Sequence, residues 1–208
     1  MIVLPPVHSV LQNQVSTSSL VRLYTKKPLA NSVTHTIVIP EVPFYSQFKD
    51  ISSLVWQKVG CGAASLAMII EYYRPDTVSV DTLLKQGVTS GAYTTSAGWS
   101  HQGLISLSKK YGLRGNAYDL STKNQTAAFS QLKDYVHDGP VIASVHYKFD
   151  PKSTIPHLVV INGIKDGIIY YNDPAAKTGE GKIPEADFIK SWKKRFIVVR
   201  PVTPDSAV

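Results

Sequence analysis

The feature that most constrains the fold is the segment of residues 63–73 (AASLAMIIEYY), in which almost every side chain is apolar. Alanine, leucine and methionine favour a helix, and Pro75 marks its end. A helix that is apolar on nearly every face is buried on nearly every face, so we expect the domain to be built around it. Cys61, with a glycine on each side, stands at the N-terminus of this central helix.

Length and composition indicate one folded domain with an extension. The chain has 208 residues, and 43% of them are apolar, which is enough to form a hydrophobic core. We expect a polar N-terminal arm over residues 1–36, with a strand near residues 20–24. The domain itself is expected over residues 37–202, followed by a short tail over residues 203–208.

The order of the predicted elements is typical of an α+β domain, because helices come first and antiparallel strands follow. Ser79 and Ser100 are expected to cap two helices, and Gly87 is expected to end the first of these. The other expected helices are residues 79–87, 100–111, 129–136 and 185–192. Strands are expected over residues 36–40, 141–147, 157–164, 168–172 and 196–200. Residues 42–47 are expected to be extended, and residues 91–98 to form a loop.

The charge pattern gives no sign of a nucleic-acid partner. The net charge is +7, but the lysines and arginines are scattered, with small clusters at 26–27, 109–110 and 193–195 and no recognisable binding module. No apolar run approaches the roughly 20 residues that span a bilayer, so no transmembrane segment is expected.

The N-terminus does not resemble a signal peptide, because residues 1–11 lack a positive start and are interrupted by prolines. The protein is therefore either cytoplasmic or exported with a signal outside this sequence, and we lean towards the second. The sequence does not indicate an oligomeric state.

The single cysteine, Cys61, is predicted to be a nucleophile. One cysteine cannot form an internal disulfide or supply the paired thiolates of a structural zinc site. The flanking glycines let a substrate approach closely, and the helix N-terminus stabilises a thiolate through its free N–H groups.

A nucleophile needs a base, and His157 is the best placed of the six histidines. It opens the hydrophobic run of residues 157–161 (HLVVI), directly after the loop of residues 150–156. His101 lies in the first turn of a helix beside Trp99, where it is placed to line a cleft. The other histidines have ordinary structural or exposed settings, and they are His8, His35, His137 and His146.

The third group of a triad would be Asn172 or Asp173, and the strand register decides between them. If residues 166–167 form a two-residue hairpin loop, Ile164 pairs with Ile169 and Asn172 shares the face of His157. If residues 165–167 form a three-residue loop, Ile164 pairs with Ile168 and Asp173 moves to that face.

We favour the three-residue loop with Gly167 at positive φ, and hence Asp173. A carboxylate stabilises an imidazolium better than an amide does. For the oxyanion hole, Gln47 and Gln57 are both candidates to add a side-chain N–H to the backbone N–H of Cys61.

Taken in order, the motifs resemble the bacteriocin-leader (double-glycine) peptidase-like family of the papain-like cysteine peptidase superfamily. The resemblance spans about residues 40–200. It is carried by residues 42–47 (VPFYSQ), 61–68 (CGAASLAM), 98–100 (GWS), 139–142 (GPVI), 157–163 (HLVVING) and 172–174 (NDP).

The resemblance implies a papain-like fold in which the central helix packs on an antiparallel sheet. It also implies a triad of Cys61, His157 and Asp173, with Gln47 rather than Gln57 in the oxyanion hole. No membrane segment or nucleotide-binding domain follows, so a stand-alone form is expected.

The preferred hypothesis is a thiol hydrolase that cleaves a peptide or amide bond in a peptide or protein substrate. Gly98, Trp99 and His101 would shape its substrate cleft, although core packing is an equally good explanation of Trp99. No cofactor is expected.

The sequence also allows three alternatives. Acyl transfer would use the same residues, and a non-catalytic peptide-binding module would keep only the fold. The intact cysteine, histidine and aspartate weigh against the binding module. Metal-dependent hydrolysis through His101, Cys61 and His157 finds no support in a ligand-spacing motif.

Overall fold

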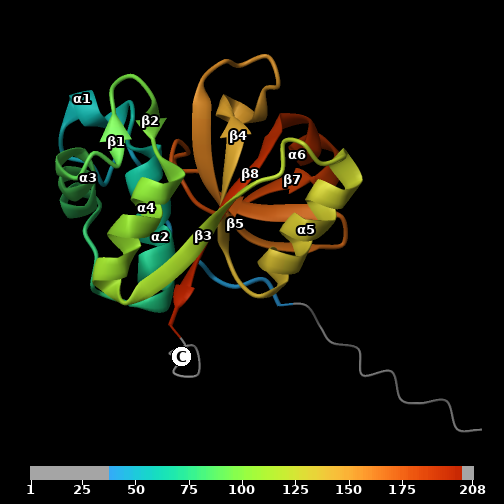
Figure 1. Cartoon of the computed structure of the whole chain (residues 1–208), viewed down its shortest axis with the longest axis horizontal. Coiled ribbons are helices and arrows are strands. Elements are labelled where there is room, and N and C mark those ends of the chain that lie inside the picture. The colour runs from blue at the N-terminus through green and yellow to red at the C-terminus, as the bar shows by residue number, and fades with distance from the viewer. Residues whose placement is uncertain (1–37, 203–208) are drawn as a thin grey trace, which may run out of the picture. The chain divides into compact units, whose positions relative to one another are not determined.

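The computed structural model describes residues 38–202, whose elements are drawn in Figure 1. The predicted arm of residues 1–36, its strand near residues 20–24 and the tail of residues 203–208 lie outside the described residues. Within residues 38–202, no helix is both long enough and apolar enough to cross a membrane.

The predicted central helix is confirmed as α2 (Cys61–Tyr73), and Cys61 is its first residue. Every residue from Gly62 to Ile70 is buried, which matches the apolar character of all its faces. The cap residue Gly60 offers no side-chain hydrogen bond, so the first N–H groups of the helix have no side-chain acceptor from their cap.

Short helices and a small hairpin pack around α2. Ser79 and Ser100 cap helices as predicted, because each side chain accepts a hydrogen bond from a backbone N–H three residues later. The elements are α1 (Leu54–Gln57), α3 (Val80–Thr89), β1 (Tyr93–Thr94), β2 (Gly98–Trp99), α4 (His101–Ser108) and the 3₁₀ turn η1 (Lys109–Tyr111).

A six-stranded antiparallel sheet forms the other part of the domain, with strand order β3-β8-β4-β5-β6-β7. Its strands are β3 (Leu113–Asp119), β4 (Val141–His146), β5 (Pro156–Lys165), β6 (Ile168–Asn172), β7 (Gly181–Pro184) and β8 (Trp192–Pro201). Between them lie α5 (Gln125–His137), the 3₁₀ turn η2 (Tyr147–Phe149) and α6 (Glu185–Ser191).

The central strands of the sheet are buried on both faces. Ile142, Leu158 and Val160 point towards α2 and belong to the core that contains the helices α2, α3 and α4. Their neighbours along the strands, such as Ala143 and Val159, belong to a second core with α5 and α6. Figure 1 shows the same arrangement, with α1 to α4 on one side of the sheet and α5 and α6 on the other. This is the α+β architecture that the sequence predicts.

Several predicted elements need correction. Residues 38–40 form no strand, and residues 91–98, expected to be a loop, contribute to the β1–β2 hairpin. The strands β3 and β7 and the helix α1 were not predicted. Gly87 does not end α3, which continues to Thr89. Gly87 lies against the Trp99 indole, where a β-carbon would overlap the ring.

Candidate active site

A cleft of about 700 Å³ opens between the N-terminus of α2 and the sheet. Cys61 comes from the helix, His157 from the start of β5, and Gln47 from the turn before α1. Gly98, Trp99 and His101 come from β2 and α4. The cleft is lined by all of these residues and also by Phe48, Lys58, Val59, Tyr93, Thr95, Ser96, Ala97, Ser144, Tyr147, Ile155, Pro156, Leu158, Lys193 and Arg195.

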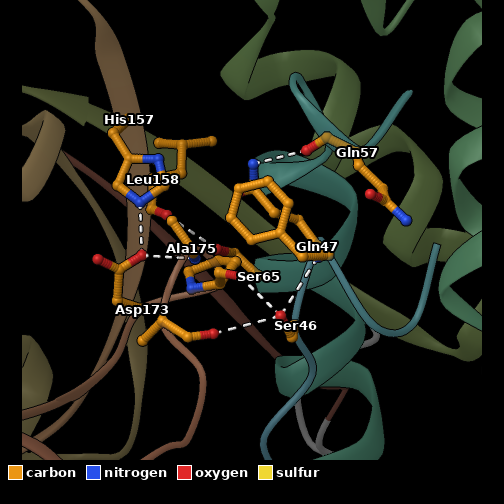
Figure 2. A network of polar contacts seen from close by, with 11 residues as sticks. Ser46, Gln47, Gln57, Ser65, His157, Leu158, Asp173 and Ala175 are labelled. Carbon is orange, nitrogen blue, oxygen red and sulfur yellow. Dashed lines mark hydrogen bonds and ion pairs between the residues drawn. The ribbon is translucent and has the colours of Figure 1, made fainter. Parts of the chain in front are cut away.

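The imidazole of His157 is held by the carboxylate of Asp173. The distance from Nε2 of His157 to Oδ1 of Asp173 is 2.6 Å, and His157 is only 4% exposed. The same carboxylate oxygen accepts the backbone N–H of Ala175 at 2.8 Å, which fixes its orientation (Figure 2). The ring of Tyr147 packs edge-on against the imidazole, with ring centroids 5.2 Å apart.

The environment of His157 favours its charged form. Burial alone lowers the pKa of this imidazole, but hydrogen bonding to Asp173 and to Cys61 outweighs burial and raises the pKa to about 9. Because Nε2 is taken by Asp173, Nδ1 is the ring nitrogen left for the thiol. A raised pKa is the condition for an imidazolium beside a thiolate at neutral pH.

Asp173 shares the face of His157 because the pairing of β5 with β6 shifts by one residue. The shift lies within the strands and not in the hairpin loop, where it was predicted. The hairpin has a two-residue loop, because Ile164 pairs with Ile169, and the predicted three-residue loop is wrong. A β-bulge between Ile161 and Gly163 then moves the register by one residue, so that Ile161 faces Tyr171. The bulge therefore places Asp173 on the same face of the sheet as His157. The predicted three-residue loop would have had the same effect.

The turn itself has the geometry of a tight hairpin. Asp166 and Gly167 have φ values of 52° and 75°, as a two-residue primed turn requires, so the predicted positive φ at Gly167 is confirmed.

Asn172, the alternative to Asp173, has a different set of contacts. Its amide nitrogen donates to the carbonyl of Val42 at 2.9 Å, and its oxygen accepts the N–H of Glu180 at 2.9 Å. It therefore ties the extended segment before Gln47 to the sheet and does not contact the imidazole in the structure.

Of the two candidate glutamines, Gln47 lies in the cleft. Its side chain is buried, and its Nε2 donates to the carbonyl of Gln57 at 2.7 Å (Figure 2). Its Oε1 is buried and has no hydrogen-bond partner among residues 38–202. A β-carbon at Gly60 would come 3.3 Å from the Gln47 Cβ, so the glutamine packs against the residue before Cys61. Gln57 does not line the cleft, and its own amide donates to the carbonyl of Ile51 at 2.9 Å.

The backbone of Gln47 is also fixed to the segment that follows Asp173. Its N–H donates to the carbonyl of Pro174 at 2.9 Å, and the preceding Ser46 hydroxyl donates to the same carbonyl at 3.4 Å. The segments that carry Gln47 and Asp173 are therefore joined directly by hydrogen bonds.

Trp99 has a packing role as well as a place in the cleft wall. Its indole lies against Gly62 and Gly87, where a β-carbon would overlap the ring, and its Nε1 donates to the carbonyl of Val59 at 2.6 Å. It thus holds the turn that leads into Cys61. Gly98, which precedes it, has φ of 73°, a conformation that favours glycine.

His101 forms a polar pair with Ser144 in the cleft wall, with 2.9 Å between Nε2 and Oγ. Burial lowers the pKa of His101, and the nearby Arg195 lowers it further, although Asp119 opposes them. These surroundings therefore favour the neutral form of the imidazole. Ser144 and Tyr147 were not predicted as cleft residues. No local sequence pattern marks them, and they reach the cleft only in the folded domain.

The remaining histidines lie elsewhere. His137 is exposed beside Asp138, and His146 contacts the carbonyl of Ser153, while His8 and His35 lie outside the described residues. Within residues 38–202, no group of three or more His, Cys, Asp and Glu side chains is arranged to hold a metal ion.

Comparison with known proteins gives the class. The family model described as "Peptidase_C39 like family" matches residues 39–196. The fold and the site define a papain-like cysteine peptidase, and the chain belongs to the Peptidase C39-like family.

Among curated proteins, the chain is 28% identical over 141 residues to the pediocin PA-1 transport/processing ATP-binding protein PedD of Pediococcus acidilactici. This match covers 68% of the chain and 17% of PedD, so the chain corresponds to a small part of that relative.

Two solved structures share the fold. The first is a double glycine motif protease from an AMS/PCAT transporter in complex with a leader peptide, with 26% identity and a TM-score of 0.56 over 80% of this chain and 96% of that one. The second is the peptidase domain of Streptococcus ComA, with 21% identity and a TM-score of 0.53 over 70% of this chain and 93% of that one.

Proposed function

We propose that this chain cleaves a peptide bond with Cys61 as nucleophile, His157 as base and acid, and Asp173 as the group that orients and charges the imidazole. The observation that carries the proposal is the 2.6 Å contact between His157 and Asp173, set in the same cleft as the first residue of α2. A thiolate gains from the N-terminus of a helix and from an adjacent imidazolium.

The first step acylates the enzyme. The Cys61 sulfur attacks the carbonyl carbon of the scissile bond and a C–S bond forms, while the carbonyl oxygen becomes an oxyanion. The imidazolium of His157 then gives its Nδ1 proton to the leaving nitrogen as the C–N bond breaks.

The second step is hydrolysis. Water attacks the thioester carbonyl, neutral His157 takes one of its protons, and the C–S bond breaks to restore the thiolate–imidazolium pair. Asp173 keeps its negative charge throughout, because it only stabilises the imidazolium.

The oxyanion is proposed to bind the backbone N–H of Cys61 and one side-chain N–H of Gln47. An amide nitrogen has two N–H donors, and only one is used by the bond to Gln57. Packing of Gln47 against Gly60 holds the start of the glutamine side chain beside the residue that precedes Cys61. Such a donor fixed in advance contributes to catalysis because it needs no reorganisation during the reaction.

The proposed substrate is an extended peptide. The cleft volume of about 700 Å³ is sufficient for several residues, and the similar double glycine motif protease is described in complex with a leader peptide. A peptide that contains a Gly-Gly pair is therefore the first substrate to test.

The test is incubation of the protein with a pool of synthetic peptides that includes Gly-Gly sequences, followed by mass spectrometry. The same pool is treated with Cys61→Ala, and the reaction is run in water enriched in ¹⁸O. The proposal expects cleaved peptides that carry ¹⁸O and that are absent with Cys61→Ala. In a parallel reaction with an added amine, products that carry the amine and no ¹⁸O would show acyl transfer instead. Products that persist with Cys61→Ala would contradict the proposal.

A further inference from the structure

Apart from the Cys61–His157 pair, the charged side chains that line the cleft are all cationic. They are Lys58, Lys193 and Arg195, and none of the lining residues is an aspartate or a glutamate. Among the described residues, the side chains of Lys58 and Lys193 make no hydrogen bond or ion pair. Their charges are therefore not neutralised by a neighbouring carboxylate.

An irregularity in β8 brings two of these cations to the cleft. Val145 of β4 faces Trp192, but the adjacent Ser144 faces Arg195, so Lys193 and Lys194 are extra residues in β8. Lys194 has φ of 55°, and its ammonium turns to the carbonyl of Lys123 at 2.8 Å. Lys193 is left on the cleft side.

Arg195 is held in a row that crosses the sheet. Asp119 faces Arg195, Arg195 faces Ser144, and Ser144 faces Leu158 in successive strand pairs. The Nε of Arg195 donates to Asp119 at 2.9 Å, and within residues 38–202 its two terminal amino groups make no hydrogen bond. The guanidinium is thus oriented by one carboxylate and still has donors for a second one.

The cleft wall beside these cations is polar. His101 and Ser144 are hydrogen-bonded to each other, and Arg195 adjoins both, since it faces Ser144 and lines a second hollow together with His101. A polar wall with cations at its edge suits an anion, because the cations attract it and the polar groups offer hydrogen-bond partners.

We propose that Lys193 and Arg195, with His101 and Ser144 beside them, form a subsite for a substrate carboxylate in the peptidase cleft. The inference rests on the proposed function and adds a substrate class, namely peptides with an acidic side chain or a free terminal carboxylate near the scissile bond. Lys58, on the helix side of the cleft, adds to the same positive potential.

The first test compares two alkylating reagents on Cys61. Iodoacetate carries a carboxylate, whereas iodoacetamide is its neutral counterpart and corrects for any change in thiol reactivity. The rate ratio of iodoacetate to iodoacetamide is measured for wild type, Lys193→Gln and the matched control Lys109→Gln. Lys109 is an exposed lysine in η1 that does not line the cleft.

The ratio is expected to fall about 2- to 3-fold in Lys193→Gln at low salt, as Coulomb attraction across a solvated cleft implies, and to stay at the wild-type value in Lys109→Gln. The difference should vanish in about 1 M salt, where the Debye length is about 3 Å. An equal ratio in all three proteins at low salt would overturn the inference but leave the peptidase intact. A Cys61 that is slow with both reagents would instead count against the proposed function.

The second test identifies the source of the carboxylate. A peptide with one cleavable bond is prepared with Gln or Glu at each flanking position, and with a free or an amidated C-terminus. The structure predicts a higher kcat/KM for one Glu position or for the free C-terminus, and a loss of that preference in Lys193→Gln. Equal kcat/KM for all members in the wild type would overturn the inference.

Discussion

The hydroxyl of Ser65 donates to the backbone carbonyl of Leu158 across a distance of 3.2 Å. Ser65 lies one helical turn after Cys61 in α2, and Leu158 follows His157 in β5. Both residues are buried, so the bond joins the helix of the proposed nucleophile directly to the strand of its base. This contact involves neither the thiol of Cys61 nor the imidazole of His157, but it helps to fix their relative position.

Replacement of Ser65 by alanine is expected to reduce the reactivity of Cys61 as well as the stability of the fold. Loss of one buried hydrogen bond costs about 1 kcal/mol of unfolding free energy. The matched control is Ser108→Ala, since Ser108 is equally buried but bonds to Ile105 within its own helix at 2.8 Å. We expect similar urea midpoints for the two variants, and an iodoacetamide rate at pH 6.5 that falls about 3- to 10-fold only in Ser65→Ala. Equal rates in both variants would show that this bond does not position the thiol.

Asp173→Asn should lower the pKa of His157. Asparagine keeps an oxygen for the N–H of Ala175 but removes the negative charge, so burial then dominates and disfavours the imidazolium. The measurement is an NMR titration of the His157 ring, which should give a pKa of about 9 in the wild type and a clearly lower one in the variant. Asp166→Asn, in the exposed hairpin turn, is the control and should leave the titration unchanged.

The same titration has a consequence for stability. The pKa of His157 is raised from 6.5 to about 9 in the folded protein, so its ion pair stabilises the fold fully below about pH 6.5. That stabilisation is lost as the pH rises through about 9, and it should be absent at every pH in Asp173→Asn, which lacks the ion pair.

Gln47→Ala should lower kcat strongly, and Gln57→Ala should not. A side-chain donor in an oxyanion hole contributes about 2.7–4 kcal/mol, which corresponds to about 100- to 1000-fold in kcat. Gln57 bonds to Ile51 outside the cleft, so its truncation should mainly reduce stability. Steady-state kinetics on a cleaved peptide measure the difference, and a larger loss in Gln57→Ala would reverse the assignment.

Gly87→Ala should destabilise the domain although it lies within a helix. Alanine normally favours a helix over glycine by about 1 kcal/mol, but here its methyl group would overlap the Trp99 indole. We expect a net loss of about 1–3 kcal/mol by urea unfolding, as for other overpacked cores. Lys85→Ala, at an exposed position of the same helix, should change stability by less than about 0.5 kcal/mol. A more stable Gly87→Ala would contradict the packing described for Trp99.

Local patterns were sufficient to predict the elements that carry the site. The apolar segment before Pro75 defined α2, and the run that begins at His157 defined β5. Serine caps fixed the starts of α3 and α4. These signals lie within a few residues of the elements that they specify, which is why they can be recognised without a structure.

The rest depends on partners that are distant in sequence. Strand β3 is polar, and it forms because Leu113–Asp119 pairs with β8 some eighty residues later. The sequence predicts a helix end at Gly87, because its packing partner Trp99 belongs to another element and cannot be recognised locally. The register that places Asp173 depends on a bulge at Asn162, for which the hairpin sequence gives no sign.

The central claim is that Cys61 is kept reactive by His157, and alkylation of Cys61 by iodoacetamide across pH tests it most directly. Rates are measured by mass spectrometry for wild type, His157→Ala and the control His137→Ala, whose histidine is exposed and remote from the cleft. We expect fast modification below about pH 7 in wild type and His137→Ala, and slow modification there in His157→Ala. Equal and slow rates in all three proteins would contradict it.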